Sequence, residues 1–254
     1  MPDGLAFATS RAHRDLPTKM ADRLIVALDF HDIEQARNVV KILKGIVSFF
    51  KLGLRLQYEP GFGDLLTELK DEGNRIFLDA KMYDIPETVS GAVASAVRRK
   101  VDFITVHGDE SIMRAAVTAK GESEIKIFAI TVLTSLDDAS LAAMGYAVGA
   151  RELVQLRARL AVQSGCDGII ASADDQPNDL RKLAESVGLL IATPGVRRKN
   201  AVADDQKRIA TPGEAIASGA DYLVVGRPIL NASDPVEEAA AFIKEMEDAA
   251  RPAA

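Results

Sequence analysis

The chain has 254 residues, of which 48% are hydrophobic and 27% charged, which is the balance of an ordinary globular protein. Its net charge of −6 argues against a surface for nucleic acid or an anionic membrane, but it allows a small, locally basic pocket. The single cysteine, Cys166, excludes an intramolecular disulfide, and no apolar run approaches the roughly 18 residues of a membrane span. We therefore expect a cytoplasmic protein.

The first segment, "MPDGLAFATSRAHRDLPTK" (1–19), is basic overall but lacks the long apolar core of a signal peptide. We expect residues 1–20 to form a flexible extension. An amphipathic transit peptide and translation from Met20 are the alternatives. Residues 21–250 are expected to form one domain, because barrels of this length commonly do.

Short apolar runs recur along this domain, and they are continuous rather than alternating. Such runs are typical of parallel strands that are covered on both faces. The expected strands are 23–29, 46–53, 75–81, 102–108, 126–133, 167–172, 189–195 and 221–226.

Segments with helical spacing lie between these runs, such as 32–45, 88–100 and 177–188. Strands that alternate with helices in this way predict a single-domain (β/α)8 TIM barrel. A doubly wound sheet is the alternative fold.

Some charged residues are expected to be structural. Asp102, Asp167 and Asp221, together with Lys126, open strands and so belong to the stability face of a barrel. "TPGE" (211–214) has the residues of a helix start with a capping box.

Other charges lie where strands end, which is the active-site face of such barrels. Asp29, Lys51, Asp79 and Lys81 fall there and predict a compact cluster of alternating charge. Asp79 and Lys81 are two residues apart and so share one side of a strand. A buried ion-pair network is the structural alternative, but such pairs are a weak source of stability.

Three further features concern the same face. His107 fits either a structural histidine or a ligand contact. Gly226 and Arg227 follow the last strand, where phosphate sites are frequent in barrels. The long loop after the seventh strand, which holds Arg197, Arg198, Gln206 and Arg208, is interpreted either as a lid over a phosphate or as a mobile basic loop.

These motifs together resemble the orotidine 5′-phosphate decarboxylase family over about residues 23–235. The landmarks are "VALD" (26–29), "KLG" (51–53), "FLDAKMYDIPET" (77–88), "TVHG" (105–108), "TVLTS" (131–135), "TPGVR" (193–197), "DDQ" (204–206) and "VVGRPI" (224–229). One departure is "GDESIM" (108–113), where many relatives carry small residues.

The resemblance implies decarboxylation of orotidine 5′-phosphate to UMP, without metal or cofactor, in a homodimer. It implies that Lys81 is the proton donor and that Asp79, Lys51 and Asp84 are its catalytic neighbours. Asp84 and Thr88 would reach the neighbouring subunit's site. The remaining substrate contacts would be Asp29 with the ribose, Thr134 with the pyrimidine, and Arg197, Gln206, Gly226 and Arg227 with the phosphate.

Three rival functions stay open. A Mg²⁺-dependent sugar-phosphate decarboxylase or aldolase shares the barrel and the "DxKxxD" pattern, but such relatives carry a Glu ligand where this chain has Lys51. A non-catalytic nucleotide-binding barrel would bind UMP without turnover. A Schiff-base lyase would need a neutral Lys81, which two neighbouring acids disfavour.

Overall fold

The computed structural model describes residues 16–173, 175, 177–185, 187–198 and 210–250. Gln206 and Arg208 of the predicted basic loop lie outside these residues, as do residues 1–15 of the predicted extension.

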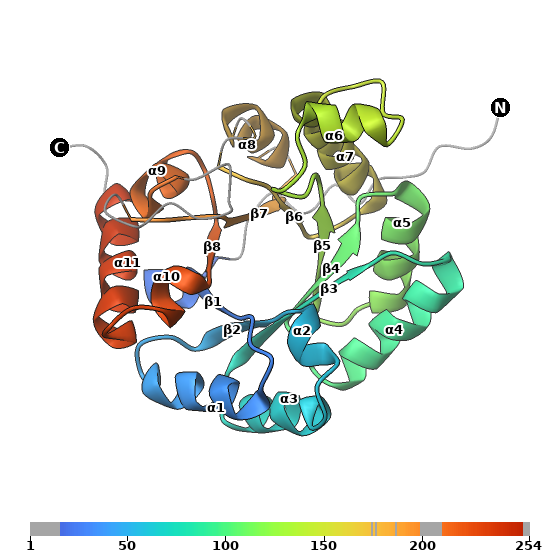
Figure 1. Ribbon diagram of the computed structural model, residues 1–254. Helices are drawn as coiled ribbons and strands as arrows, with labels where there is room; N and C mark the ends of the chain where they lie inside the picture. Colours follow the sequence, from blue (N-terminus) through green and yellow to red (C-terminus); the bar gives the residue numbers. More distant parts are fainter. Residues whose placement is uncertain (1–15, 174, 176, 186, 199–209, 251–254) are drawn as a thin grey trace.

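Eight parallel strands form a closed barrel in which neighbours follow chain order (Figure 1). The strands are β1 (Leu24–Leu28), β2 (Phe49–Leu52), β3 (Arg75–Met82), β4 (Phe103–His107), β5 (Lys126–Ile130), β6 (Gly168–Ile170), β7 (Leu190–Pro194) and β8 (Tyr222–Val225). The ring closes where β1 pairs with β8, with Leu24 opposite Leu223. Every predicted apolar run contributes a strand, and the predicted (β/α)8 barrel is confirmed.

Helices surround this ring (Figure 1). They are η1 (Met20–Arg23), α1 (Ile33–Ile42), α2 (Leu54–Gln57), α3 (Phe62–Asp71), α4 (Pro86–Arg98), α5 (Glu110–Lys120), α6 (Asp138–Ala143), α7 (Ala150–Ser164), α8 (Pro177–Glu185), α9 (Pro212–Ala217), α10 (Arg227–Leu230) and α11 (Pro235–Ala250). The predicted capping box begins α9, where Thr211 and Glu214 exchange hydrogen bonds of 2.8 and 3.2 Å. Among the described helices, none combines the length and the apolar character that a membrane crossing requires.

The strands bury side chains on both faces, which explains their continuous apolar runs. On β1, Leu24, Val26 and Leu28 belong to the core between strands and helices, whereas Ile25 and Ala27 face the barrel interior. We call the inward-facing set the interior cluster: Ile25, Ala27, Phe49, Phe77, Phe103, Phe128, Leu190, Ala192, Tyr222 and Val224. Aromatic rings fill its middle, so the barrel is a packed core and not a pore.

Leu16 packs against the interior cluster, although it lies in the predicted flexible extension. The end of that extension is therefore in contact with the barrel. The cluster supplies a reason, since a barrel must cover its inner apolar side chains at both ends.

Three strands start with the same polar arrangement, which we call the aspartate clamp. Asp102, Asp167 and Asp221 directly precede β4, β6 and β8. Each carboxylate accepts a hydrogen bond from the second residue of the preceding strand: Ile76 N (2.7 Å), Ile127 N (2.9 Å) and Ile191 N (2.8 Å). Each aspartate also forms an ion pair with a cation on the helix that precedes β3, β5 or β7: Lys70 on α3 (2.7 Å), Lys120 on α5 (2.6 Å) and Arg181 on α8 (2.9 Å). The predicted structural role of these aspartates is confirmed.

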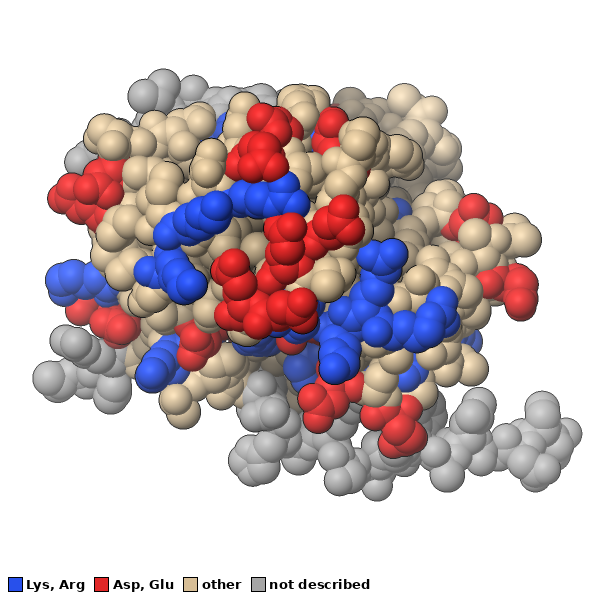
Figure 2. Space-filling model, turned by 90° about the horizontal axis from the view of Figure 1, so that it is seen from below, with Lys and Arg blue, Asp and Glu red and all other residues tan. Residues whose placement is uncertain are grey.

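The side of the molecule on which α1 and α3 lie carries charges of both signs, as Figure 2 shows. Arg37 of α1 makes two hydrogen bonds to the carboxylate of Glu68 on α3, of 2.7 and 2.8 Å. It also bonds Glu34 on its own helix. On this face, Arg37 therefore links the two helices through ion pairs.

Candidate active site

Along β1 to β4, the barrel interior changes from apolar to polar toward the C-terminal ends of the strands. Side chains two residues apart share a face of a strand. The positions two residues beyond Ala27, Phe49, Phe77, Phe103 and Val224 of the interior cluster are Asp29, Lys51, Asp79, Thr105 and Gly226. The aromatic core is therefore capped by polar groups at the C-terminal ends of the strands, where barrel active sites form.

Three of these side chains, those of Asp29, Lys51 and Asp79, form one connected network with Lys81, which lies two residues beyond Asp79. Lys81 Nζ lies 2.6 Å from Asp79 Oδ2, and Lys51 Nζ lies 3.2 Å from the same oxygen. Lys51 also donates to Asp29 Oδ1 at 3.0 Å. The order along the network is thus Asp29, Lys51, Asp79, Lys81, with alternating charge as the sequence predicts. The functional roles of these residues stay predictions.

The middle of the network is buried and its ends are open. The side chains of Lys51 and Asp79 are each 10% exposed, against 34% for Lys81 and 49% for Asp29. Burial alone would raise the pKa of Asp79, but Lys51 and Lys81 outweigh it and lower that pKa. Burial likewise opposes the charge of Lys51, yet Asp79 and Asp29 raise its pKa overall. Both central groups are therefore held charged.

Thr105 on β4 completes the network and was missed by the sequence reasoning. Its hydroxyl donates to Asp79 Oδ1 at 2.9 Å and accepts from Lys81 N, also at 2.9 Å. It lies two residues before His107, so the strand period alone would have placed it on the same inner face. Threonine is common in strands, and for that reason its chemistry gave no separate signal.

The backbone of β3 is irregular where it carries Lys81. Leu78 pairs with Ile104 and Met82 with Val106, so four steps on β3 match two on β4. Within this bulge Lys81 has a φ of 45°, a left-handed conformation that is uncommon outside glycine. Bulges next to active sites re-aim side chains, and strain of this kind persists only where its surroundings hold it. Here the Thr105 hydroxyl holds the Lys81 amide.

Gly53 makes room for the network beyond β2. A Cβ at this position would lie 2.5 Å from Asp29 Oδ1 and 3.1 Å from Lys51 Nζ. Any side chain there would displace the ion pair. The glycine of "KLG" is therefore part of the site's geometry, a role that the sequence reasoning did not assign.

Asp84 and Thr88 stand apart from this network. Both are exposed, with Thr88 on the first turn of α4 and Asp84 just before that helix. Asp84 Oδ1 accepts from Ile85 N at 2.7 Å. Tyr83 and Ile85, which flank Asp84, are 67% and 66% exposed, so this acid lies in an outward-facing apolar setting.

Three of the four predicted phosphate residues, Arg197, Gly226 and Arg227, lie just beyond the ends of β7 and β8. Gly226 follows β8, and a Cβ there would lie 3.5 Å from Ala27 and 3.8 Å from Asp29 Oδ2. Arg227 begins α10, and Arg197 N donates to Ala210 O at 2.9 Å at the boundary of the undescribed loop. Arg198 instead bonds Glu238 and Glu245 of α11 at 2.9 and 2.7 Å. Gln206 lies outside the described residues.

His107 ends β4, and Thr134 lies four residues beyond the end of β5. Thr134 is half-buried in a turn closed by a hydrogen bond of 2.9 Å from Leu136 N to Leu133 O. The His107 ring packs against Tyr83 with centroids 4.7 Å apart. Burial and the cation of Arg157 lower the pKa of His107, with Lys81 adding to this and Asp109 opposing it.

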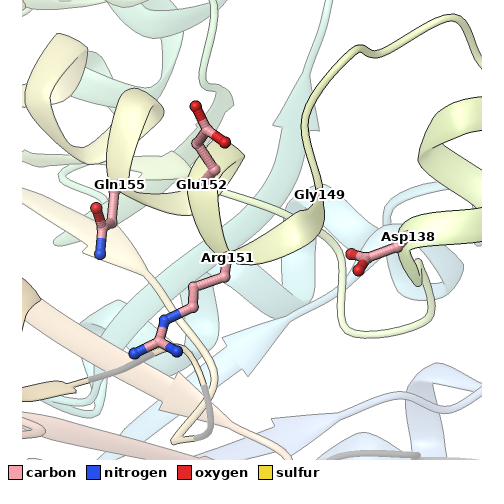
Figure 3. Close-up of a pocket in the computed structure, with 5 residues that line it drawn as sticks. All are labelled: Asp138, Gly149, Arg151, Glu152 and Gln155. Carbon is pink, nitrogen blue, oxygen red and sulfur yellow. The ribbon is translucent and has the colours of Figure 1, made fainter.

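An open depression lies beside α7, separate from the charge network. Asp138, Gly149, Arg151, Glu152 and Gln155 line it (Figure 3). In the part of the chain that the structure describes, no three or more His, Cys, Asp or Glu side chains are grouped as metal ligands.

A closed parallel barrel with a preorganised charge network at its C-terminal mouth defines a (β/α)8-barrel protein of the enzyme type. The Orotidine 5′-phosphate decarboxylase / HUMPS family matches residues 22–242. The chain belongs to this family.

Named relatives agree with this assignment. The orotidine 5′-phosphate decarboxylase of Nitrobacter winogradskyi is 49% identical over 231 residues, which cover 91% of this chain and 95% of that protein. That of Methylococcus capsulatus is 45% identical over 88% of this chain and 91% of that protein. The crystal structure of orotidine 5′-phosphate decarboxylase from Lactobacillus acidophilus has a TM-score of 0.75 at 34% identity, covering 89% of this chain and 99% of that one.

Proposed function

We propose that this protein decarboxylates orotidine 5′-phosphate to UMP and CO2, with Lys81 as the proton donor to C6. The observation that carries the proposal is the network in which Asp79 Oδ2 lies 2.6 Å from Lys81 Nζ and 3.2 Å from Lys51 Nζ. The family assignment and the names of the relatives support the same reaction.

The reaction breaks the bond between C6 and the carboxylate. CO2 leaves, and the bonding electron pair stays on C6 as a carbanion that has no adjacent carbonyl group to delocalise it. The ammonium group of Lys81 stabilises this charge and then transfers a proton to C6, giving UMP. Solvent returns the proton to Lys81, whose side chain is 34% exposed.

The other network residues keep this arrangement ready before substrate binds. Asp79 holds the Lys81 ammonium group, and Thr105 holds the second oxygen of Asp79. Lys51 stays cationic between two acids. Fixed charges that need no reorganisation during the reaction are an effective source of transition-state stabilisation. The half-exposed Asp29 is placed to orient Lys51 and to reach ribose hydroxyls.

The phosphate and the base bind away from the reacting carbon. Gly226, Arg227 and Arg197 form the phosphate end in this proposal, joined by Gln206 from the loop outside the described residues. Arginine suits this role because its fork of N–H groups matches phosphate oxygens. Thr134 contacts the pyrimidine. Binding energy from the remote phosphate then lowers the barrier at C6.

The enzyme acts as a homodimer, with Asp84 and Thr88 reaching the neighbouring site. The support is their exposure beside the apolar side chains of Tyr83 and Ile85. Exposed apolar side chains of this kind mark interaction surfaces. Asp84 lies apart from the charge network of its own chain and is flanked by exposed apolar side chains, so it is suited to contribute to the active site of a partner subunit.

The reaction needs no metal or organic cofactor in this proposal. The rival Mg²⁺-dependent chemistry requires a cluster of oxygen ligands, and here the Lys51 ammonium lies between Asp29 and Asp79. A cation at this position repels a divalent ion. We place the enzyme in the cytoplasm, where a buried thiol such as Cys166 stays reduced.

The direct test is the ultraviolet change on conversion of orotidylate to UMP, measured with and without EDTA. We expect turnover in both conditions. Lys81→Ala should fold and bind inorganic phosphate like the wild type, yet lose nearly all turnover. Wild-type activity in Lys81→Ala would refute the catalytic role, and loss of activity in EDTA would favour the metal-dependent rival.

A further inference from the structure

The segment that carries Thr134 runs from the end of β5 to the start of α7, residues 131–149, and we call it the base segment. Thr131 fixes its first residue to β6 through a hydrogen bond of 2.7 Å from its hydroxyl to Ile170 O. Thr134 itself lies in a tight turn three residues later. The position of Thr134 therefore depends on what holds the rest of this segment.

Arg157 on α7 holds both the beginning and the end of the base segment. Its Nη1 donates to Thr131 O at 2.6 Å, and its Nη2 donates to Tyr146 Oη at 3.0 Å. The guanidinium carbon also lies 5.8 Å from the centroid of the Tyr146 ring. The planar guanidinium group of Arg157 thus joins Thr131 and Tyr146, which are fifteen positions apart in the sequence.

A second contact holds the middle of the segment to the same helix. Asp138 points toward the first turn of α7 (Figure 3), and its Oδ1 accepts from Ala150 N at 2.7 Å. A Cβ on Gly149 would lie 2.9 Å from this oxygen. Helix α7 therefore holds the base segment in place, and Arg157 is the side chain that bonds both the beginning and the end of that segment.

The end of β4 leaves space for this arginine. A Cβ on Gly108 would lie 2.8 Å from Arg157 Cδ and 2.6 Å from Ile130 O. Gly108 is the first residue of the stretch 108–113, so this stretch and the arginine meet at the mouth of the barrel. The side chain of Arg157 passes through space that only a glycine at 108 provides.

We propose that Arg157 is a positioning residue for recognition of the base, and that it acts by setting the place of Thr134 through its bonds to Thr131 and Tyr146. The inference rests on the proposed function, because the contact of Thr134 with the pyrimidine is part of it. Among the described residues, Arg157 makes hydrogen bonds to Thr131 and Tyr146 but none to the charge network, so its loss should affect binding of the base more than binding of the phosphate.

The test compares Arg157→Met, Arg157→Lys and Tyr146→Phe with Arg159→Met, a control on an exposed position of the same helix. We expect Arg157→Met to raise KM for orotidylate and to weaken UMP binding roughly tenfold or more, as loss of a hydrogen bond to a charged group implies. Binding of ribose 5-phosphate, which lacks the base, should stay within about twofold, because the phosphate end is untouched. Arg157→Lys and Tyr146→Phe should give smaller changes of the same kind.

A spectroscopic readout tests the geometry without activity. The chain has three histidines, so the imidazole of His107 can be followed by NMR titration. Its pKa should rise in Arg157→Met, because the guanidinium cation is one of the groups that lower it. Arg159→Met should leave it unchanged.

Equal weakening of UMP and ribose 5-phosphate would overturn the proposal, and so would unchanged UMP binding in folded Arg157→Met. If Arg157→Met does not fold, the same comparison in Arg157→Lys and Tyr146→Phe decides. A wild-type protein without turnover or UMP binding refutes the proposed function and this inference together, whereas an active wild type with unaffected variants refutes only the inference.

Discussion

Thr105 Oγ1 donates a hydrogen bond of 2.9 Å to Oδ1 of Asp79, which leaves Oδ2 of that carboxylate to the two lysines. The same hydroxyl accepts from the backbone of Lys81 at 2.9 Å. Thr105 is fully buried, at 0% exposed. One threonine therefore orients the central acid and also holds the strained residue that carries the proposed proton donor.

Replacement of Thr105 by valine keeps the shape but removes both hydrogen bonds. We expect a loss of about 1–3 kcal/mol in the free energy of unfolding, because a buried carboxylate oxygen and a backbone N–H lose their partner. Turnover should fall by roughly tenfold or more as Lys81 loses its fixed orientation. Urea unfolding and the orotidylate assay measure the two effects. Thr105→Ser is the matched control, and equal behaviour of Val and Ser variants would contradict the role.

The dimer predicts complementation between two inactive variants. Lys81→Ala and Asp84→Ala should each be weakly active alone, but a mixed dimer has one site with both residues intact. Equal mixing with random pairing should restore up to roughly a quarter of wild-type activity. Activity is measured after subunits have been exchanged or co-expressed.

The control for complementation is a mixture of Lys81→Ala with Asp79→Ala. These two residues belong to the same chain's network, so every site of the mixed dimer stays defective. If Asp84→Ala mixtures recover no more than this control, Asp84 does not act across the interface.

Acid should weaken the fold through Asp79. Despite burial, the neighbouring lysines lower the pKa of Asp79 in the folded protein from its usual 3.8. At a pH between the folded and the unfolded pKa, Asp79 binds more protons in the unfolded chain than in the folded protein. Its contribution to the free energy of unfolding is therefore complete above about pH 3.8 and is lost as the pH falls through the pKa of the folded state. Urea unfolding at a series of pH values should show this slope in wild type. In Asp79→Asn, the part of this pH dependence that comes from Asp79 should be absent. The same pH dependence in both proteins would count against an ionised Asp79 paired with the lysines.

The aspartate clamps should dominate stability at the other end of the barrel. Lys120→Met leaves the buried Asp167, whose side chain is 8% exposed, without its cation. We expect a loss of about 3–5 kcal/mol in the free energy of unfolding, with turnover preserved at temperatures where the protein stays folded. Lys244→Met removes a pair whose lysine is 72% exposed, and it should cost under about 0.5 kcal/mol. Similar losses in the two variants would refute the clamp.

The strands, the charge network and the structural role of three aspartates could be predicted because each rests on a pattern of a few residues, whereas the cations that complete the aspartate clamps were not predicted. The predicted strands are apolar on both faces, and in the run 75–81 this apolar character is interrupted by Asp79 and Lys81. Charged side chains are rarely buried without a partner, so these two residues stand out. Asp102, Asp167 and Asp221 precede strands, which is enough to place them opposite the site.

The remaining features depend on contacts between distant residues. The bulge at Leu78–Met82 and the positive φ of Lys81 follow from pairing with β4, and no local signal in β3 announces them. Thr105 and Arg157 act through partners on other strands and loops, so neither residue type stands out in its own segment. Leu16 lies in a segment of mixed composition, and only the interior cluster that it touches explains its place.

Each aspartate clamp closes within one continuous stretch of chain, 70–102, 120–167 or 181–221. The three stretches do not overlap, and the residues 103–119 and 168–180 between them belong to no clamp. A chimera with a homologous barrel that is joined in those two intervals inherits each clamp whole from one parent. Each stretch contains the end of one helix, the strand that follows it, and the helix or helices after that strand. Recombination at the borders of these stretches should therefore preserve folding better than a junction inside any of them.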